Sequence, residues 1–137
     1  MNQKIFRLLD ANYNRAKEAT RVTEDLIRFL TNDQALTRSM KHCRHKITQT
    51  LLTFPVTYRT LVKSRDVSCD VGRNHVIYDR QKKPSLQDTL IINFKRAQES
   101  MRVLEELSKM ISQKHSDQFK TIRFSLYEFE KKAIRKL

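Results

Sequence analysis

The segment KSRDVSCDVGR combines arginines with two aspartates four positions apart, a composition suited to binding phosphate. Asp66 and Asp70 provide hard oxygen ligands for Mg²⁺, which usually binds one or two carboxylates together with substrate phosphates. Arg65, Arg73 and, further along the chain, Arg80 carry guanidinium groups that can bind phosphate through two parallel hydrogen bonds. The sequence therefore predicts a magnesium-assisted phosphate site in this part of the chain.

Gly72, in the same segment, is the only glycine among the 137 residues, although average composition would give about ten. A single glycine in such a chain indicates a backbone position with positive φ or a close approach to a ligand, and we predict this for Gly72. The scarcity also excludes a P-loop and a dinucleotide-binding fingerprint, since both need several glycines. A phosphate site in this chain must therefore be built from side chains.

A second set of candidate site residues lies in a motif that occurs twice. NYNRAKEATRVTEDL begins at Asn12, and NFKRAQESMRVLEEL begins at Asn93. We call the separation in sequence between these two asparagines the repeat offset. A weaker repeat, at nearly the same separation, relates the segment around Arg44 to the segment around Arg123. We therefore expect two copies of a helix–helix unit, packed around a pseudo-twofold axis.

Each motif places an asparagine in the middle of an apolar helical stripe, at a turn of roughly 100° per residue. A buried amide without partners costs about 1–3 kcal/mol, so Asn12 and Asn93 need specific hydrogen bonds. These bonds either cross-link the two motif helices or bind a ligand. Arg15 and Arg96 lie at the edge of the stripe, where they can reach a bound phosphate.

Glu18 belongs to a ladder with Arg21, Asp25 and Arg28 at helical spacing. The simplest interpretation is ion pairing within one helix, at about 0.2–0.5 kcal/mol per pair. Glu99 repeats Glu18 in the second motif, which favours a functional role for these two glutamates. We consider them candidates to bind a metal or to support its ligands.

Apolar periodicity predicts an all-α fold, an antiparallel helical bundle of two pseudo-repeated hairpins joined by a long irregular loop. Pro55 stops the second helix, and Ser85 with Asp88 predicts a capping box at the start of the fourth. The 39% of hydrophobic residues fits one folded domain, 1–137. We expect repeat one over 1–62, the connecting site loop over 63–84 and repeat two over 85–137. The predicted helices span about 3–31, 34–54, 56–62, 85–112 and 116–136.

The formal net charge is +13, from 28 Lys and Arg against 15 Asp and Glu. Residues 34–65 carry +7 without an acidic residue and residues 114–137 carry +4, while the rest is close to neutral. Such a field attracts nucleic acid, acidic lipid or phosphorylated small molecules. Because the two motifs are close to neutral, the distribution favours small phosphorylated substrates over nucleic acid.

The chain lacks the marks of a secreted or membrane protein. No apolar run approaches the roughly 18 residues of a membrane span, and the N-terminal residues lack the apolar core of a signal peptide. Cys43 and Cys69 do not make a disulfide scaffold, and the cluster of His42, Cys43 and His45 is no full zinc ligand set. We expect a cytoplasmic protein without a membrane partner.

Nearly the whole chain resembles the bacterial hydroxymethylpyrimidine-phosphate kinase domain that is often fused to thiamine-phosphate synthase. The resemblance rests on the segments DANYNRAKEATRVTEDLIRF, KHCRHKI, SRDVSCDVG, NFKRAQESMRVLEELSK and IRFSLYEFEK. It implies transfer of the ATP γ-phosphoryl group to 4-amino-5-hydroxymethyl-2-methylpyrimidine phosphate, which gives the diphosphate. ATP and Mg²⁺ are then the expected cofactors, and thiamine-phosphate synthase is an expected partner. A homodimer stays open.

The residue assignments for this reaction are our own hypothesis. Asp66 and Asp70 would hold Mg²⁺, while Asn12 and Asn93 would read a pyrimidine edge or orient the arginines. The arginines assigned to phosphate contacts are Arg15, Arg44, Arg65 and Arg96. Further candidate substrate-binding residues are Glu18, Gly72, Arg73 and Glu99.

Two alternatives come from other functional classes. The chain could be a non-catalytic domain associated with thiamine-phosphate synthase, although the presence of Arg15, Asp66, Asp70 and Arg96 counts against this. It could also be a small basic helical protein that binds nucleic acid through phosphates. The second alternative predicts a basic stripe on one outer face, whereas the kinase hypothesis predicts arginines that converge on a concave site.

Overall fold

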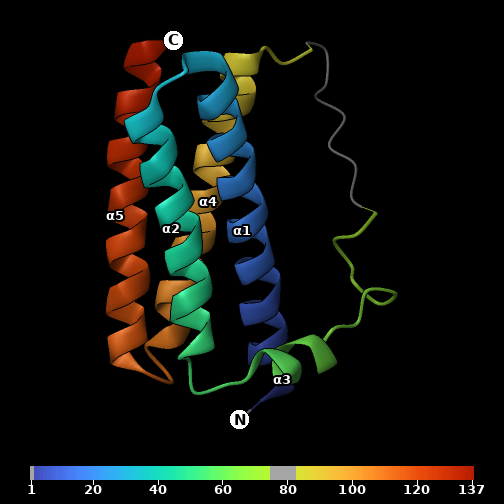
Figure 1. Cartoon of the computed structure of the whole chain (residues 1–137). Coiled ribbons are helices and arrows are strands. Elements are labelled where there is room, and N and C mark those ends of the chain that lie inside the picture. The colour runs from blue at the N-terminus through green and yellow to red at the C-terminus, as the bar shows by residue number, and fades with distance from the viewer. Residues whose placement is uncertain (1, 75–82) are drawn as a thin grey trace.

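Five helices form within residues 2–74 and 83–137, the parts of the chain that our computed structural model describes (Figure 1). No strand forms in these ranges, and the predicted all-α bundle of two hairpins is confirmed. The helices are α1 (Gln3–Thr31), α2 (Gln34–Leu52), α3 (Tyr58–Lys63), α4 (Leu86–Ser108) and α5 (Gln113–Lys136).

Each helix begins at a polar N-cap side chain that accepts a hydrogen bond from a backbone N–H of the first turn. Ser85 and Asp88 form the predicted capping box of α4. Ser112 caps α5, so this helix begins slightly earlier than predicted, and α4 also ends about one turn before its predicted end. Asn32 ends α1 in the left-handed conformation, with a φ of 53°.

The long helices α1, α2, α4 and α5 pack as an antiparallel bundle, and α3 lies across its lower end in Figure 1. α1 packs against α2 and α4, and α5 packs against the same two helices, so α1 and α5 are diagonal to each other. Among the helices of the described ranges, none combines the length and the apolar character that a membrane crossing needs. Large side chains at the centre of the core include Leu9, Ile27, Met40, Ile47, Phe94, Leu104, Phe119 and Leu126.

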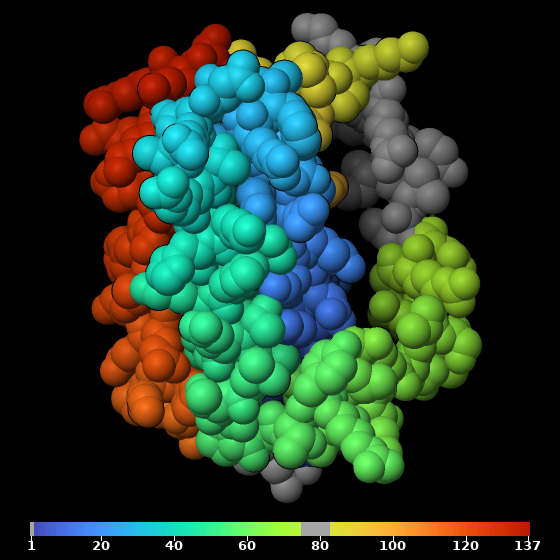
Figure 2. Space-filling model, viewed as in Figure 1, coloured from blue at the N-terminus to red at the C-terminus, as the bar shows by residue number. Residues whose placement is uncertain are grey.

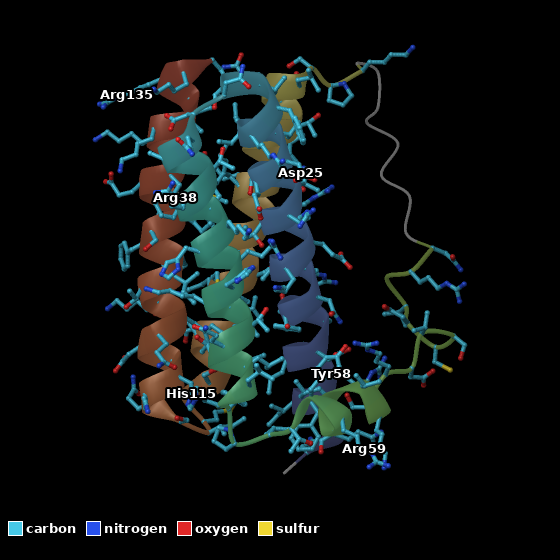
Figure 3. All side chains as sticks on the ribbon, viewed as in Figure 1. Asp25, Arg38, Tyr58, Arg59, His115 and Arg135 are labelled. Atoms are coloured by element: carbon cyan, nitrogen blue, oxygen red, sulfur yellow. The ribbon has the colours of Figure 1, made fainter. Side chains whose placement is uncertain are left out.

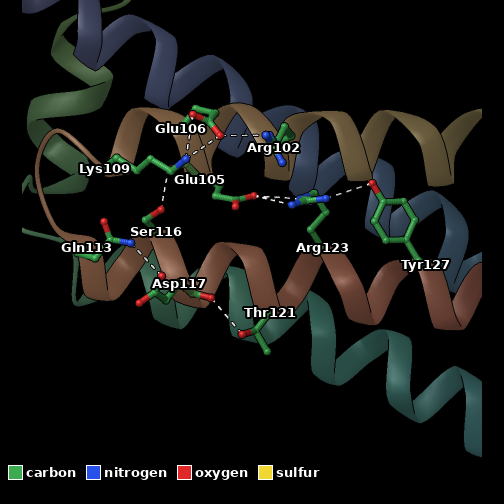
Figure 4. A network of polar contacts seen from close by, with 10 residues as sticks. All are labelled: Arg102, Glu105, Glu106, Lys109, Gln113, Ser116, Asp117, Thr121, Arg123 and Tyr127. Atoms are coloured by element: carbon green, nitrogen blue, oxygen red, sulfur yellow. Dashed lines mark hydrogen bonds and ion pairs between the residues drawn. The ribbon is translucent and has the colours of Figure 1, made fainter.

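Two buried ion pairs occupy matching positions in the two halves of the chain. In one, the Arg44 Nε of α2 lies 2.6 Å from the Glu24 carboxylate of α1. In the other, the Arg123 guanidinium of α5 lies 2.9 Å from Glu105 of α4 and donates to the Tyr127 hydroxyl (Figure 4). Each pair therefore fastens a motif helix to the helix that follows it.

The connection after α3 brings a second segment to the side of α1. Tyr58 at the start of α3 packs edge-on against Tyr13 of α1, with ring centroids 6.4 Å apart (Figure 3). The next residues, drawn in green in Figure 2, lie beside the N-terminal half of α1, drawn in blue. The chain thus places residues 65–70 opposite the motif residues of α1.

Candidate phosphate-binding site

A groove of about 670 Å³ lies between α1 and α4, the two helices that carry the repeated motif. Its lining consists of paired side chains, and the two positions of every pair are separated by the repeat offset. The arrangement brings together all six motif residues that the sequence analysis selected. The pairs are Asn12 and Asn93, Arg15 and Arg96, Glu18 and Glu99, Ala19 and Ser100, and Val22 and Val103.

The two asparagines of the groove are buried and make the same hydrogen bond. Asn12 Nδ2 donates to the Leu8 carbonyl at 2.9 Å, and Asn93 Nδ2 donates to the Thr89 carbonyl at 2.8 Å. Both bonds lie within one helix, so the amides do not cross-link α1 and α4. In the described residues neither amide takes part in a further hydrogen bond, which leaves its oxygen and second N–H for a ligand in the groove.

The two arginines and two glutamates of the groove balance one another in formal charge, but none of them is held in an ion pair within the described residues. Arg15, Arg96, Glu18 and Glu99 are exposed, and none of them has an ion-pair partner in the ranges 2–74 and 83–137. Their neighbours behave differently, since exposed Arg21 pairs with an aspartate one turn away at 3.5 Å. The predicted ladder therefore exists in part, and it leaves Glu18 out.

A second cavity, of about 600 Å³, lies between the N-terminal half of α1 and residues 65–70. Figure 2 shows the opening between these two segments. Asn12 and Arg15 line both this cavity and the groove, so the two spaces are neighbours along α1. The other polar side chains that line it are Lys4, Arg7, Asp10, Asn14, Arg65, Asp66 and Asp70.

A bidentate ion pair joins the connection to α1 at this cavity. Arg65 Nε and Nη2 donate to the two carboxylate oxygens of Asp10, at 2.5 and 2.9 Å. Asp10 is 3% exposed, and its hydrogen bonds raise the pKa of the Arg65 guanidinium above its ordinary value. Arg7 adds a bond from its guanidinium to the Asp66 carbonyl at 3.4 Å. The first residues of the connection are therefore held against α1.

Asp10 was missed by the sequence analysis, although one observation could have revealed it. The position that follows it by the repeat offset is Ile91, so the first repeat places an acid where the second places an apolar side chain. A buried carboxylate requires a charged or hydrogen-bonding partner, and a buried or half-buried arginine can be that partner. The sequence alone did not show that Arg65 would be that partner.

Asp66 and Asp70, the predicted magnesium ligands, both line the second cavity. The Asp66 carboxylate accepts hydrogen bonds from the backbone N–H of Cys69 and the Ser68 hydroxyl, and the first of these lowers its pKa most. Asp70 Oδ1 accepts from the Gly72 N–H at 2.9 Å. Within the described ranges no cluster of three or more metal-ligating side chains forms, so a bound Mg²⁺ would take its remaining ligands from phosphate and water.

Of the two alternatives predicted for Gly72, the positive φ is wrong, and the close approach to a ligand stays a prediction. The residue is exposed with an ordinary φ, and an added Cβ would meet only Asp70 Oδ1, at 3.5 Å. The turn is closed by the Asp70 carboxylate instead, which needs no left-handed residue.

Two predicted phosphate ligands stand apart from the two cavities, and a third lies outside the described residues. Arg44 is held by Glu24 in its buried ion pair, and it lines neither cavity. Arg73 is exposed, and its backbone N–H donates to the Asp70 carbonyl. Arg80 lies outside the described residues.

The model of the ThiD2 family matches residues 7–132, which include the groove, both buried ion pairs and all of the second cavity's lining except Lys4. The chain belongs to the ThiD2 family. This ThiD2 domain is 33% identical over 128 residues to a thiamine-phosphate synthase of Thermosynechococcus vestitus, covering 93% of this chain and 35% of that protein. It is 31% identical over 126 residues to a thiamine-phosphate synthase of Rhodopirellula baltica, covering 92% of this chain and 33% of the relative.

A third relative is the thiamine-phosphate synthase of Gloeobacter violaceus, 33% identical over 131 residues, which cover 96% of this chain and 37% of that protein. The ThiD2 domain thus spans about a third of the length of the relatives it matches. No solved structure matches it.

Proposed function

We propose that this chain transfers the γ-phosphoryl group of ATP to 4-amino-5-hydroxymethyl-2-methylpyrimidine phosphate in thiamine biosynthesis, with Mg²⁺ as cofactor. The observation that carries the proposal is the groove that Arg15 and Arg96 both line without ion-pair partners in the described residues. Two arginines that line one space without ion-pair partners keep their donors available for an anionic ligand. The family membership and the thiamine-phosphate synthase relatives support the pathway.

The reaction needs no general base from the protein. The acceptor is a phosphate monoester whose second pKa is about 6, so its oxygen is already ionised at neutral pH. That oxygen attacks the γ-phosphorus and forms a new P–O bond, while the bond from the γ-phosphorus to the β,γ-bridging oxygen breaks and ADP leaves with the electron pair. The protein therefore has to position two anions and neutralise their repulsion.

The described side chains can supply both parts of that task. Arg15 and Arg96 neutralise phosphate oxygens from the two sides of the groove. Asp66 and Asp70 would hold the Mg²⁺, which supplies charge neutralisation at the phosphate oxygens.

The amides and carboxylates of the groove suit an aminopyrimidine. An asparagine amide offers one donor and one acceptor, which can pair with a ring nitrogen and an adjacent amino group. Asn12 and Asn93 keep these groups toward the groove, and Glu18 and Glu99 can accept from the amino group. The apolar side chain of Val22 offers a surface for the ring methyl group.

The proposal is tested with ATP, Mg²⁺ and the pyrimidine monophosphate, with ADP release and phosphorus NMR of the diphosphate as readouts. Arg15→Ala should lower kcat/KM by about 100-fold or more. Arg21→Ala is the matched control, because Arg21 lies on the same helix, is exposed and lines neither cavity. Absence of diphosphate formation by the unaltered chain would overturn the proposal and favour a non-catalytic role.

A further inference from the structure

The two motif helices are related by the repeat along the groove, but their first turns differ in sequence. In the first turns of α1, the cations Lys4 and Arg7 line the second cavity, and their counterparts at the repeat offset, at the start of α4, are not cations. Further along, Asn14 corresponds to Lys95, which pairs with Glu130. The symmetry of the motif therefore does not extend to the first turns of the two helices. The pairs are Lys4 and Ser85, Arg7 and Asp88, and Asp10 and Ile91.

From this asymmetry we infer where each substrate binds, an inference that rests on the proposed function. The triphosphate of ATP occupies the cavity between α1 and residues 65–70, and the pyrimidine monophosphate occupies the groove between α1 and α4. The transferred phosphoryl group passes between them at Asn12 and Arg15, the two side chains that line both spaces.

Charge favours the nucleotide in the α1 cavity. Arg65 and Asp10 neutralise each other there, which leaves Lys4, Arg7 and Arg15 as cations against two carboxylates. Those carboxylates belong to Asp66 and Asp70, the proposed Mg²⁺ ligands. A bound Mg²⁺ would neutralise their negative charge and would itself attract phosphate. A triphosphate carries more negative charge than a monophosphate, so it gains more from this cavity.

The groove between the motif helices has the opposite character. Its two arginines are balanced by Glu18 and Glu99, so its formal charge is zero. Its remaining lining combines two asparagine amides with small and apolar side chains. Such a surface suits an uncharged ring that carries a single phosphate, whereas a triphosphate would meet both glutamates.

The inference is tested by calorimetric binding of each ligand alone. The nucleotide probe is the Mg²⁺ complex of a non-hydrolysable ATP analogue, and the other probe is the pyrimidine monophosphate. Arg7→Ala should weaken nucleotide binding by about tenfold and change monophosphate binding by less than about twofold. Arg96→Ala should do the reverse, and Arg15→Ala should weaken both. Arg102→Ala is the control, because its exposed side chain pairs with Glu106 away from both spaces.

The outcomes separate this inference from the proposed function. In one outcome the unaltered chain makes diphosphate, but Arg7→Ala weakens monophosphate binding and Arg96→Ala weakens nucleotide binding, or each variant weakens both ligands equally. The assignment of the two spaces is then wrong, and the kinase activity stands. If neither probe binds and no diphosphate forms, both proposals fail. Should Arg7→Ala unfold, judged by circular dichroism, Lys4→Ala takes its place, since Lys4 is exposed on the first turn.

Discussion

Asp10 and Arg65 form a bidentate ion pair that joins a buried position of α1 to the first described residues after α3. The pair spans 55 positions of sequence, and the Asp10 side chain is almost inaccessible while the Arg65 side chain is 37% exposed. Since Asp66 follows Arg65 directly, this contact fixes the distance between α1 and the proposed magnesium ligands. It is a positioning contact at the edge of the site.

Asp10→Asn should therefore impair the site more than the fold. The amide keeps the shape of the carboxylate but loses its charge, and we expect a loss of about 1–2 kcal/mol in unfolding free energy because solvent screens the half-exposed arginine. The KM for ATP should rise while the KM for the monophosphate changes little. Urea unfolding and initial rates check this, with Asp25→Asn as a half-exposed control on the same helix.

Arg44 and Arg123 should behave as structural residues. Arg123→Met leaves Glu105 buried without its partner and should cost about 3 kcal/mol in unfolding free energy. Arg44→Met should cost less, because Lys17 lies near Glu24 and partly compensates its charge, whereas the position equivalent to Lys17 in the second half is Gln98.

Equilibrium urea unfolding measures both variants, and Glu106→Gln serves as the exposed control. At temperatures where the Arg44→Met protein is folded, its kcat/KM should stay within about threefold of that of the unaltered chain. A large loss of turnover in a stably folded Arg44→Met protein would instead restore the phosphate contact predicted from the sequence.

The two cysteines should differ sharply in reactivity. Burial raises the pKa of the Cys43 thiol from 9.0 to about 12, so it stays protonated at neutral pH, whereas Cys69 is exposed in the connection. A thiol reagent should modify one group per native chain and two per chain in denaturant, and Cys69→Ser should remove the native reaction. Because the folded pKa lies above the unfolded one, the contribution of Cys43 to stability should fall as the pH rises from 9.0 toward 12.

Gly72→Ala should be tolerated. Its φ is ordinary and its surroundings are open, so we expect a change within about 0.5 kcal/mol in unfolding free energy. Asn32 makes the instructive comparison, since it holds a φ of 53°, a left-handed conformation that alanine adopts only with strain. Thermal unfolding of Gly72→Ala and Asn32→Ala, the second of which should be less stable by about 1 kcal/mol, tests the contrast.

The sequence predicted the helices and the shared face of the motif residues because both follow from local periodicity. Asn12 and Asn93 lie where the apolar stripe placed them, and their helices pack side by side as the repeat implied. Pairing across helices was harder to predict. Arg44 was assigned to phosphate because its charge was visible, whereas the buried Glu24 that neutralises it lies 20 positions away on another helix. Asp10 was missed for the same reason.

The positive φ predicted for Gly72 was wrong for a different reason. Its rarity suggested a special backbone conformation, but rarity in composition does not report φ. The Asp70 side chain forms the turn by itself, and an aspartate two positions earlier was visible in the sequence as a turn-former.

The duplicated motif has a final consequence for the orientation of a ligand in the groove. A groove with perfect twofold symmetry would hold an asymmetric molecule in two opposite orientations with equal affinity, and only one of them would present the reacting oxygen correctly. Each difference of about 1.4 kcal/mol in binding free energy between the two orientations makes one of them about tenfold more populated. At the opposite end the counterpart of Arg7 is Asp88, whose carboxylate belongs to the α4 capping box, so that end lacks this cation. Divergence between the two copies thus removes the orientational degeneracy that duplication created.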